Sequence, residues 1–208
     1  MDLNKPLAYR VRPKSLDEFV GQEHVVGKDK LLYRTIKADR LSSLILWGPP
    51  GCGKTSLAKV ISETTKYKFT KLNAVTSGVG DIKKAIEEAD NPLLNPSGKC
   101  ILFIDEIHRF NKLQQDALLP FVEDGTVILI GATTENPYFE VNGALISRSS
   151  VFELKSLDKE DIKTLLKRAV YDEVKGMGSY RAEITEEALD FLADISGGDA
   201  RNALIIFF

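Results

Sequence analysis

The sequence has few cysteines, few histidines and no long apolar run. Among its 208 residues there are two cysteines, Cys52 and Cys100, and two histidines. Two thiols cannot form a four-cysteine zinc site, and the positions of these two do not suggest a disulfide. No stretch of roughly eighteen apolar residues is present to span a bilayer, and the amino terminus has no apolar signal-peptide core. We therefore expect a soluble protein of a reducing, cytoplasmic compartment, with no membrane partner.

Neither sign of charge is in large excess. The 28 basic and 30 acidic residues leave a formal net charge of -2. This balance excludes a uniformly basic nucleic-acid coat, so that any contact with DNA must come from a local patch. A hydrophobic fraction of 43% with 28% charged residues is typical of a globular protein that buries its own core.

Short apolar runs alternate with helical patterns through the first three quarters of the chain. Continuous runs bounded by turn residues indicate strands that are covered on both faces. We expect such strands at 44–47, 68–72, 100–104, 127–130 and 151–154. Helical spacing of apolar residues predicts helices at 28–39, 55–64, 79–89 and 112–121, after an irregular entry segment and with a surface loop at 91–99. This order predicts an α/β fold, a parallel five-stranded sheet with helices on both faces.

The pattern changes after residue 157. Segments 158–174, 185–195 and 199 onward are each typical of helices, with Ser156 and Thr185 as the expected amino-terminal caps. We therefore divide the chain into an α/β core at 1–157 and a small helical lid at 158–208. The apolar residues at the carboxyl end lead us to expect that the lid is incomplete here and that the natural protein continues.

A glycine-rich loop joins the first expected strand to a helix. The segment GPPGCGKT, from Gly48 to Thr55, fits the phosphate-loop pattern G-x-x-x-x-G-K-[ST] at every fixed position. Glycines let backbone N–H groups face phosphate oxygens, and the following helix directs its positive end at the same anion. Lys54 is expected to reach the β- and γ-phosphates of ATP, and the hydroxyl of Thr55 to ligate magnesium. The predicted phosphate-contacting residues are Gly48, Pro49, Pro50, Gly51, Cys52, Gly53, Lys54, Thr55 and Ser56.

Two carboxylates follow the apolar strand at 100–104. Because ligands bind at the carboxyl ends of parallel strands, Asp105 is expected to hold Mg²⁺ and Glu106 to activate the attacking water as a general base. A polar residue at the end of the strand at 127–130 is suited to bond the same water or the γ-phosphate. His108, close behind the carboxylates, is interpreted as a hydrogen-bonding or solvent-facing residue.

The order of these parts resembles the AAA+ ATPases. Within them, the chain resembles the clamp-loader and branch-migration group and most of all the replication-associated recombination protein A family, which is related to the Werner-helicase-interacting protein. The segments that carry the resemblance are PLAYR with Arg12-Pro13, VGQEH at 20–24, the phosphate loop, FIDEIHRF at 103–110, GATTENP at 131–137, ALISRSSVF at 144–152 and GGDARNA at 197–203.

The resemblance implies further roles for individual residues. Arg12 and the segment Val20, Gly21 and Gln22 would line the adenine and ribose end of the pocket. Thr134 would be the first sensor, with Thr133 and Asn136 as neighbouring alternatives. Arg148 would be an arginine finger that reaches the nucleotide of an adjacent subunit, and Arg201 a second sensor in its own subunit.

The resemblance also implies partners. It predicts an oligomeric, DNA-stimulated ATPase that acts on single-stranded, gapped or forked DNA, works with replication-fork proteins such as single-strand-binding protein, and associates with the nucleoid in a bacterium. A clamp-loader subunit and a Holliday-junction branch-migration ATPase are the alternatives among enzymes. A nucleotide-gated scaffold with little turnover is the alternative outside them.

Overall fold

The computed structural model describes residues 6–96 and 98–207. Met1–Lys5, Ser97 and Phe208, which the expected core, surface loop and lid include, lie outside the described residues. The strands are β1 (Leu44–Trp47), β2 (Lys68–Asn73), β3 (Cys100–Asp105), β4 (Ile128–Thr133) and β5 (Ser150–Glu153). The α-helices are α1 (Leu7–Arg10), α2 (Glu23–Val26), α3 (Leu31–Lys37), α4 (Lys54–Thr65), α5 (Val79–Asp90), α6 (Lys112–Asp116), α7 (Leu119–Glu123), α8 (Pro137–Glu140), α9 (Gly143–Ile146), α10 (Lys159–Tyr171), α11 (Glu186–Ser196) and α12 (Ala200–Phe207). Three short 3-10 helices complete the described elements: η1 (Leu16–Glu18), η2 (Ile107–Arg109) and η3 (Gly178–Tyr180).

The strands form one parallel sheet in the order β2-β3-β4-β1-β5. β1 lies between β4 and β5, where Ile45 pairs with Gly131 on one side and Val151 on the other. All strands therefore end at the same edge of the sheet. The predicted five-stranded parallel sheet is confirmed. Four strands lie within one residue of their expected bounds, and β4, expected at 127–130, continues three residues further to Thr133.

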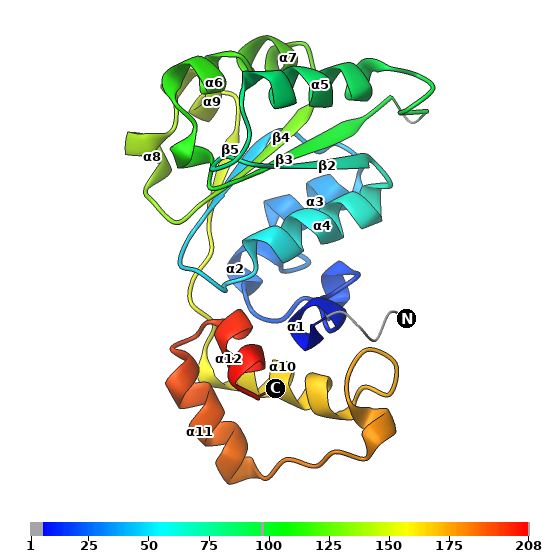
Figure 1. Cartoon of the computed structure of the whole chain (residues 1–208), viewed down its shortest axis with the longest axis vertical. Helices are drawn as coiled ribbons and strands as arrows, with labels where there is room; N and C mark the ends of the chain where they lie inside the picture. Colours follow the sequence, from blue (N-terminus) through cyan, green and yellow to red (C-terminus); the bar gives the residue numbers. More distant parts are fainter. Residues whose placement is uncertain (1–5, 97, 208) are drawn as a thin grey trace.

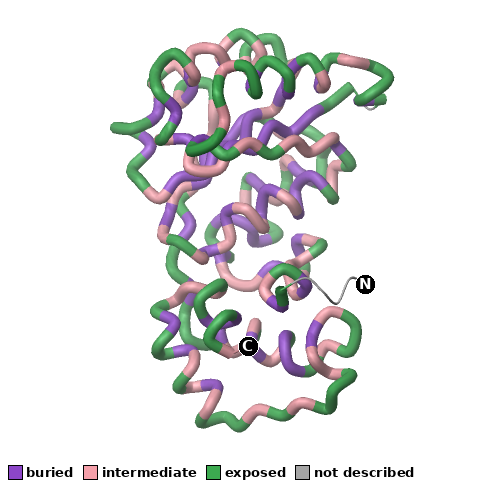
Figure 2. Tube along the Cα trace, in the orientation of Figure 1, coloured by how far each residue is buried: buried purple, intermediate pink, exposed green. Residues whose placement is uncertain are grey.

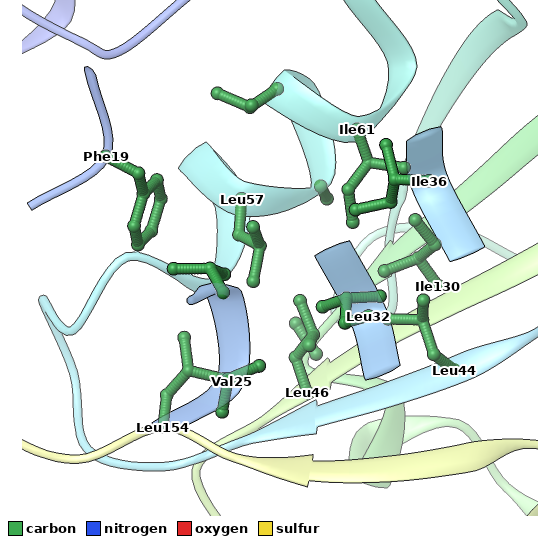
Figure 3. Packing of buried hydrophobic residues seen from close by; sticks show 14 of the residues in the cluster. Phe19, Val25, Leu32, Ile36, Leu44, Leu46, Leu57, Ile61, Ile130 and Leu154 are labelled. Carbon is green, nitrogen blue, oxygen red and sulfur yellow. The ribbon is translucent and has the colours of Figure 1, made fainter. Parts of the chain in front are cut away.

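Helices cover both faces of the sheet, as predicted (Figure 1). Because side chains alternate along a strand, Leu44 and Leu46 of β1 join one apolar cluster and Ile45 joins the other. Helices α3 and α4 pack on the first face, and Figure 3 shows Leu57 of α4 in the cluster with Leu46. Helix α5 packs on the second face. The inner strands β1, β3 and β4 are consequently buried along most of their length, whereas the edge strands β2 and β5 are only partly buried (Figure 2).

Helices α10, α11 and α12 form a separate layer beyond the carboxyl edge of the sheet (Figure 1). Their apolar cluster includes Ile162 and Leu166 of α10, Leu189 of α11 and Leu204 of α12. Leu7 of α1 belongs to the same cluster, so a segment from the amino terminus packs within the helical lid. Along residues 6–96 and 98–207, no helix combines the length and the apolar character needed to cross a membrane.

Four expectations that concern helices need correction. The expected helix at 112–121 is divided into α6 and α7, because Pro120 cannot donate to the carbonyl of Asp116 and its ring disfavours a continuous helix. The expected helix at 158–174 ends at Tyr171, because the carboxylate of Asp172 accepts the N–H groups of Val174 and Lys175 in a turn. The entry segment, expected to be irregular, contains α1, η1 and α2, and the helix expected at 28–39 is the shorter α3.

The amino-terminal caps of the lid helices agree with the sequence at one of two positions. Thr185 caps α11, as predicted, by accepting the N–H of Ala188 at 3.2 Å. The cap of α10 is Asp158 rather than Ser156. The carboxylate of Asp158 accepts the N–H of Asp161 at 2.8 Å, and the N–H of Asp158 donates to the carboxylate of Asp161 at 3.3 Å. Ser156, two residues earlier, cannot make this reciprocal pattern.

Replacing Asp158, the cap of α10, should therefore lower the free energy of unfolding, whereas replacing Ser156 should leave it almost unchanged. We expect Asp158→Ala to lower the free energy of unfolding by about 1 kcal/mol, through the loss of a bond to an otherwise unpaired helix N–H. The matched Ser156→Ala variant should stay within about 0.5 kcal/mol of the parent protein. Urea unfolding monitored by circular dichroism measures both. A loss for Ser156→Ala equal to that for Asp158→Ala would contradict the assignment.

Candidate functional site

A cavity of about 180 Å³ opens between the carboxyl edge of the sheet and the helical lid. Its walls come from the core and from α10 and α12 of the lid. Most of the residues singled out in the sequence meet here. Those that line the cavity are Arg12, Val20, Pro50, Gly51, Cys52, Gly53, Lys54, Thr55, Ser56, Asp105, Glu106, Thr134 and Arg201.

The glycine-rich loop closes around the ammonium group of Lys54. Nζ of Lys54 donates to the carbonyl oxygens of Gly48 and Pro49, at 2.7 Å each, and the side chain is buried. Gly48 and Pro49 do not line the cavity themselves, but their carbonyls hold the lysine beside it. The loop continues directly into α4, whose first N–H groups have no partners within the helix. A fixed ammonium and these N–H groups together favour an anion at this point.

Gly51 is in contact with the lid. Its φ of +68° lies in the left-handed region, and a Cβ built on it would come within 1.9 Å of a carboxylate oxygen of Asp199. The N–H of Ala200, at the start of α12, donates to the carbonyl of Gly51 at 3.3 Å. The carboxylate of Asp199 in turn accepts the N–H of Asn202. Only a residue without a side chain permits this direct contact between the loop and α12.

The two carboxylates lie at the end of β3 and have different surroundings. Asp105 forms an ion pair with Lys71 of β2, with 2.9 Å between Nζ and Oδ2. Glu106 has a φ of +57°, an unfavourable conformation for a residue with a Cβ, and its Oε2 lies 3.5 Å from the hydroxyl of Thr134. The same oxygen lies 3.4 Å from Nδ1 of His108. The general-base candidate therefore has polar groups beside it from the residue that follows β4 and from η2.

Arg12, Arg168 and Arg201 line the cavity, and two of them, Arg12 and Arg201, influence each other. Arg12 comes from the amino-terminal segment and Arg201 from α12. Burial lowers the pKa of Arg12, and the positive charge of Arg201 lowers it further. The guanidinium of Arg12 also lies over the ring of Tyr9, 4.9 Å from its centroid. Because two like charges brought together repel each other, a bound anion between them would be stabilised.

Gly21, Gln22 and Arg148 are the predicted site residues that the structure leaves off the cavity wall along with Gly48 and Pro49. Nε2 of Gln22 donates to the carbonyls of Cys52 and Lys155, and its Oε1 accepts the N–H of Lys155. Its buried amide therefore links the glycine-rich loop to the segment that leads into the lid.

Arg148 lies on the outer surface of the core. One of its nitrogens is 2.7 Å from a carboxylate oxygen of Glu123, and another donates to the carbonyl of Ala144. Its side chain is 41% exposed. The structure therefore leaves this guanidinium accessible from outside the chain rather than from its own cavity.

Other lining residues were not identified from the sequence. They are Ala8, Val11, Pro13, Glu18, Phe19, Leu157, Leu165, Arg168, Ala200 and Leu204. Most are apolar and come from segments far apart in the chain, so no local pattern marks them. Lys71, the partner of Asp105, was also missed. Its signal is its place near the carboxyl end of β2, which the sheet register sets beside β3.

The comparisons with known proteins agree with this geometry. The model of the AAA family, "ATPase family associated with various cellular activities", matches residues 44–157. Replication-associated recombination protein A of Haemophilus influenzae is 50% identical over 199 residues, which cover 96% of this chain and 44% of that protein. ATPase WRNIP1 of Dictyostelium discoideum is 49% identical over 199 residues, 96% of this chain and 22% of that protein. The chain thus spans less than half the length of these curated relatives.

A solved structure is also similar. The Holliday junction branch migration motor RuvB of Thermotoga maritima superposes with a TM-score of 0.77 at 31% identity. The match covers 95% of this chain and 64% of that one.

The loss of stability caused by crowding between residue 51 and the lid can be measured apart from the loss caused by backbone strain. Gly197 has a similar φ of +60°, but nothing lies within 4 Å of a Cβ built there. Alanine at either position should cost about 1–2 kcal/mol of backbone strain. Gly51→Ala should lose about 1–3 kcal/mol more, because Asp199 must move.

Thermal unfolding of Gly51→Ala, Gly197→Ala and the double variant Gly51→Ala/Asp199→Ala tests this difference. The double variant should recover part of the excess loss. Equal destabilisation by the two single substitutions would show that the loop and α12 do not constrain each other.

Proposed function

The chain belongs to the AAA family of ATPases, and we propose that it binds ATP with Mg²⁺ in the cavity between core and lid and hydrolyses it to ADP and phosphate. One observation carries the proposal. The phosphate loop with its enclosed Lys54, the two carboxylates of β3 and the arginine of α12 all border the same cavity. This is the set of groups that phosphoryl transfer to water requires.

The cationic groups account for binding of the polyphosphate. The N–H groups at the start of α4 and the ammonium of Lys54 would contact the β- and γ-phosphates. Arg201 would approach the γ-phosphate from the lid, and Arg12 would lie toward the ribose and base. The apolar lining, which includes Val11, Leu165 and Leu204, suits the flat face of a purine.

The residues present fit a magnesium ion. Thr55 and Asp105 both line the cavity and offer a hydroxyl and a carboxylate, the oxygen ligands that Mg²⁺ prefers. The ion would neutralise charge on the β- and γ-phosphates. Lys71, whose side chain is 45% exposed, pairs with Asp105 and is free to turn toward solvent when that carboxylate takes a metal.

Glu106 is the group suited to activate water. We assign to it the acceptance of a proton from the water molecule whose oxygen attacks the γ-phosphorus. The bond from that phosphorus to the β–γ bridging oxygen breaks, and ADP leaves. Thr134, 3.5 Å from the Glu106 carboxylate, is positioned to bond the same water, which supports its role as the first sensor over Thr133 and Asn136.

The outward position of Arg148 supports an assembly of several chains. An arginine that does not reach the cavity of its own chain can still complete the site of a neighbour, where it would stabilise charge on the γ-phosphate. We therefore propose a homo-oligomer in which Arg148 acts as a finger between subunits. The ion pair with Glu123 would have to open in such an interface.

The relatives suggest where this ATPase acts. Because the proteins with about 50% identity are named for replication-associated recombination, we propose the same setting, with single-stranded, gapped or forked DNA and fork proteins such as single-strand-binding protein as partners. Branch migration, the activity for which the RuvB motor is named, is the second candidate, supported by the superposition at 31% identity.

Substitutions at Lys54 and Glu106 should separate binding from hydrolysis. We expect Lys54→Ala to abolish both, because the polyphosphate loses its enclosed cation. Glu106→Gln should retain ATP binding but lose turnover by a factor of about 100 or more, since an amide cannot accept the proton. The matched control is Glu135→Gln, the same change at an exposed residue off the cavity wall.

Titration calorimetry and phosphate release measure these effects, with and without single-stranded or forked DNA. Stimulation by forked DNA supports the recombination setting, and stimulation by four-way junctions alone supports branch migration. Tight ATP binding with no turnover by the parent chain at any protein or DNA concentration would replace the enzyme by a nucleotide-gated scaffold.

Substitution of Arg148 and substitution of Arg201 should affect different steps, turnover and ATP binding respectively. Arg148→Ala should leave ATP affinity unchanged and reduce turnover by about a thousandfold, whereas Arg201→Ala should weaken ATP binding in its own chain. Arg40→Ala, at an exposed arginine away from the cavity, is the control. Mixing Arg148→Ala with Lys54→Ala should restore turnover, because an intact loop then meets an intact finger. Failure of every mixture to recover activity argues against action between subunits.

A further inference from the structure

His108 connects the general-base candidate to the neighbouring strand. It lies in η2, and its side chain is only 12% exposed. Its Nδ1 is 2.8 Å from the hydroxyl oxygen of Thr133 and 3.4 Å from Oε2 of Glu106. Thr133 is the last residue of β4 and is completely buried. One ring nitrogen thus contacts both the buried end of the sheet and the carboxylate.

The surroundings decide which way the hydrogen bonds run. The hydroxyl of Thr133 accepts the N–H of Glu135 at 3.0 Å and lies within 3.4 Å of the carbonyl of that residue, to which it can donate. An ionised Glu106 only accepts. Both neighbours of Nδ1 therefore accept a hydrogen bond when this nitrogen carries a proton. An unprotonated Nδ1 would instead direct its lone pair at a carboxylate oxygen.

Few other contacts with the described residues limit the movement of the Glu106 carboxylate. Its backbone has the left-handed φ of +57°, and its contact with Thr134 is long, at 3.5 Å. The bond between His108 and Thr133 is the shortest in this group and is anchored in the buried end of β4. Movement of the carboxylate is therefore limited by a ring that cannot itself move freely.

We propose that His108 is a positioning residue: its Nδ1–H, bonded to Thr133 at 2.8 Å, also attracts Oε2 of Glu106 at 3.4 Å and so holds that carboxylate in the orientation for water activation. This inference rests on the proposed ATPase function and adds to it a group that does not line the cavity. The consequence is that the end of β4, which Thr134 directly follows, and the general base move as one unit.

Three substitutions test the assignment. His108→Leu removes the donor, His108→Asn places an amide N–H close to the position of Nδ1, and Thr133→Val removes the anchor. For each we would measure kcat and KM for ATP by phosphate release, ATP affinity by calorimetry and the thermal unfolding midpoint. The same substitutions are also made in the Glu106→Gln background.

We expect His108→Leu to reduce kcat about tenfold with KM for ATP and ATP affinity within about twofold of the parent, because only the orientation of the base is lost. His108→Asn should recover most of kcat, and Thr133→Val should resemble His108→Leu. In the Glu106→Gln background His108→Leu should have no further effect, a result that a general loss of folding cannot produce.

Results that contradict the positioning role of His108 differ from results that contradict the proposed function. An unchanged kcat in His108→Leu, an equal loss in His108→Asn, or a further tenfold loss in the Glu106→Gln background overturns the positioning role while leaving the proposed function intact. Full turnover by Glu106→Gln, or none by the parent chain, overturns the proposed function and this inference with it.

Discussion

The parallel pairing of β1 with both β4 and β5 is the constraint on which the site depends. It sets the end of β1, and hence the phosphate loop, beside the end of β4 and next to that of β3. Lys54 and Glu106 are fifty-two positions apart in the chain, yet they border the same cavity. An antiparallel arrangement would direct alternate strand ends to opposite edges and separate these groups. The apolar clusters on both faces of the sheet maintain this register.

The cavity combines charges of both signs in separate places. Lys54, Arg12 and Arg201 supply positive charge, and Asp105 and Glu106 supply negative charge. A bare polyphosphate would be attracted by the first group and repelled by the second, and a divalent cation removes that repulsion. In the absence of such a cation, Lys71 offsets part of the charge of Asp105. The distribution of charge therefore supports the proposal that the nucleotide binds together with a metal ion.

The lid is linked to the phosphate loop by short backbone and side-chain contacts. Ala200 bonds to the carbonyl of Gly51, and Gln22 joins the loop at Cys52 to Lys155 before the lid. Leu7 extends the lid cluster back to the amino terminus. A change in the shape of the loop would be transmitted to α12 through these contacts, which gives a physical route from the state of the nucleotide to movement of the lid.

The sequence by itself determined the strands, the glycine-rich loop and the carboxylate pair, because each is a local pattern of residues whose spacing reflects the geometry of a strand, a turn or a helix end. The AAA family followed from the resemblance of these and other segments to that family. Predictions from the local sequence were wrong where two local preferences conflicted. Pro120 interrupts a segment with helical spacing, and Asp158 rather than Ser156 caps α10. Only the tertiary structure decided which residues lie together. Examples are the hydrogen bond of Gln22 to the carbonyl of Cys52, the pairing of Lys71 with Asp105, and the contact of His108 with Glu106 and Thr133. Contacts of this kind join segments that are distant in the chain, and their geometry follows from strand order and packing, which no local spacing specifies.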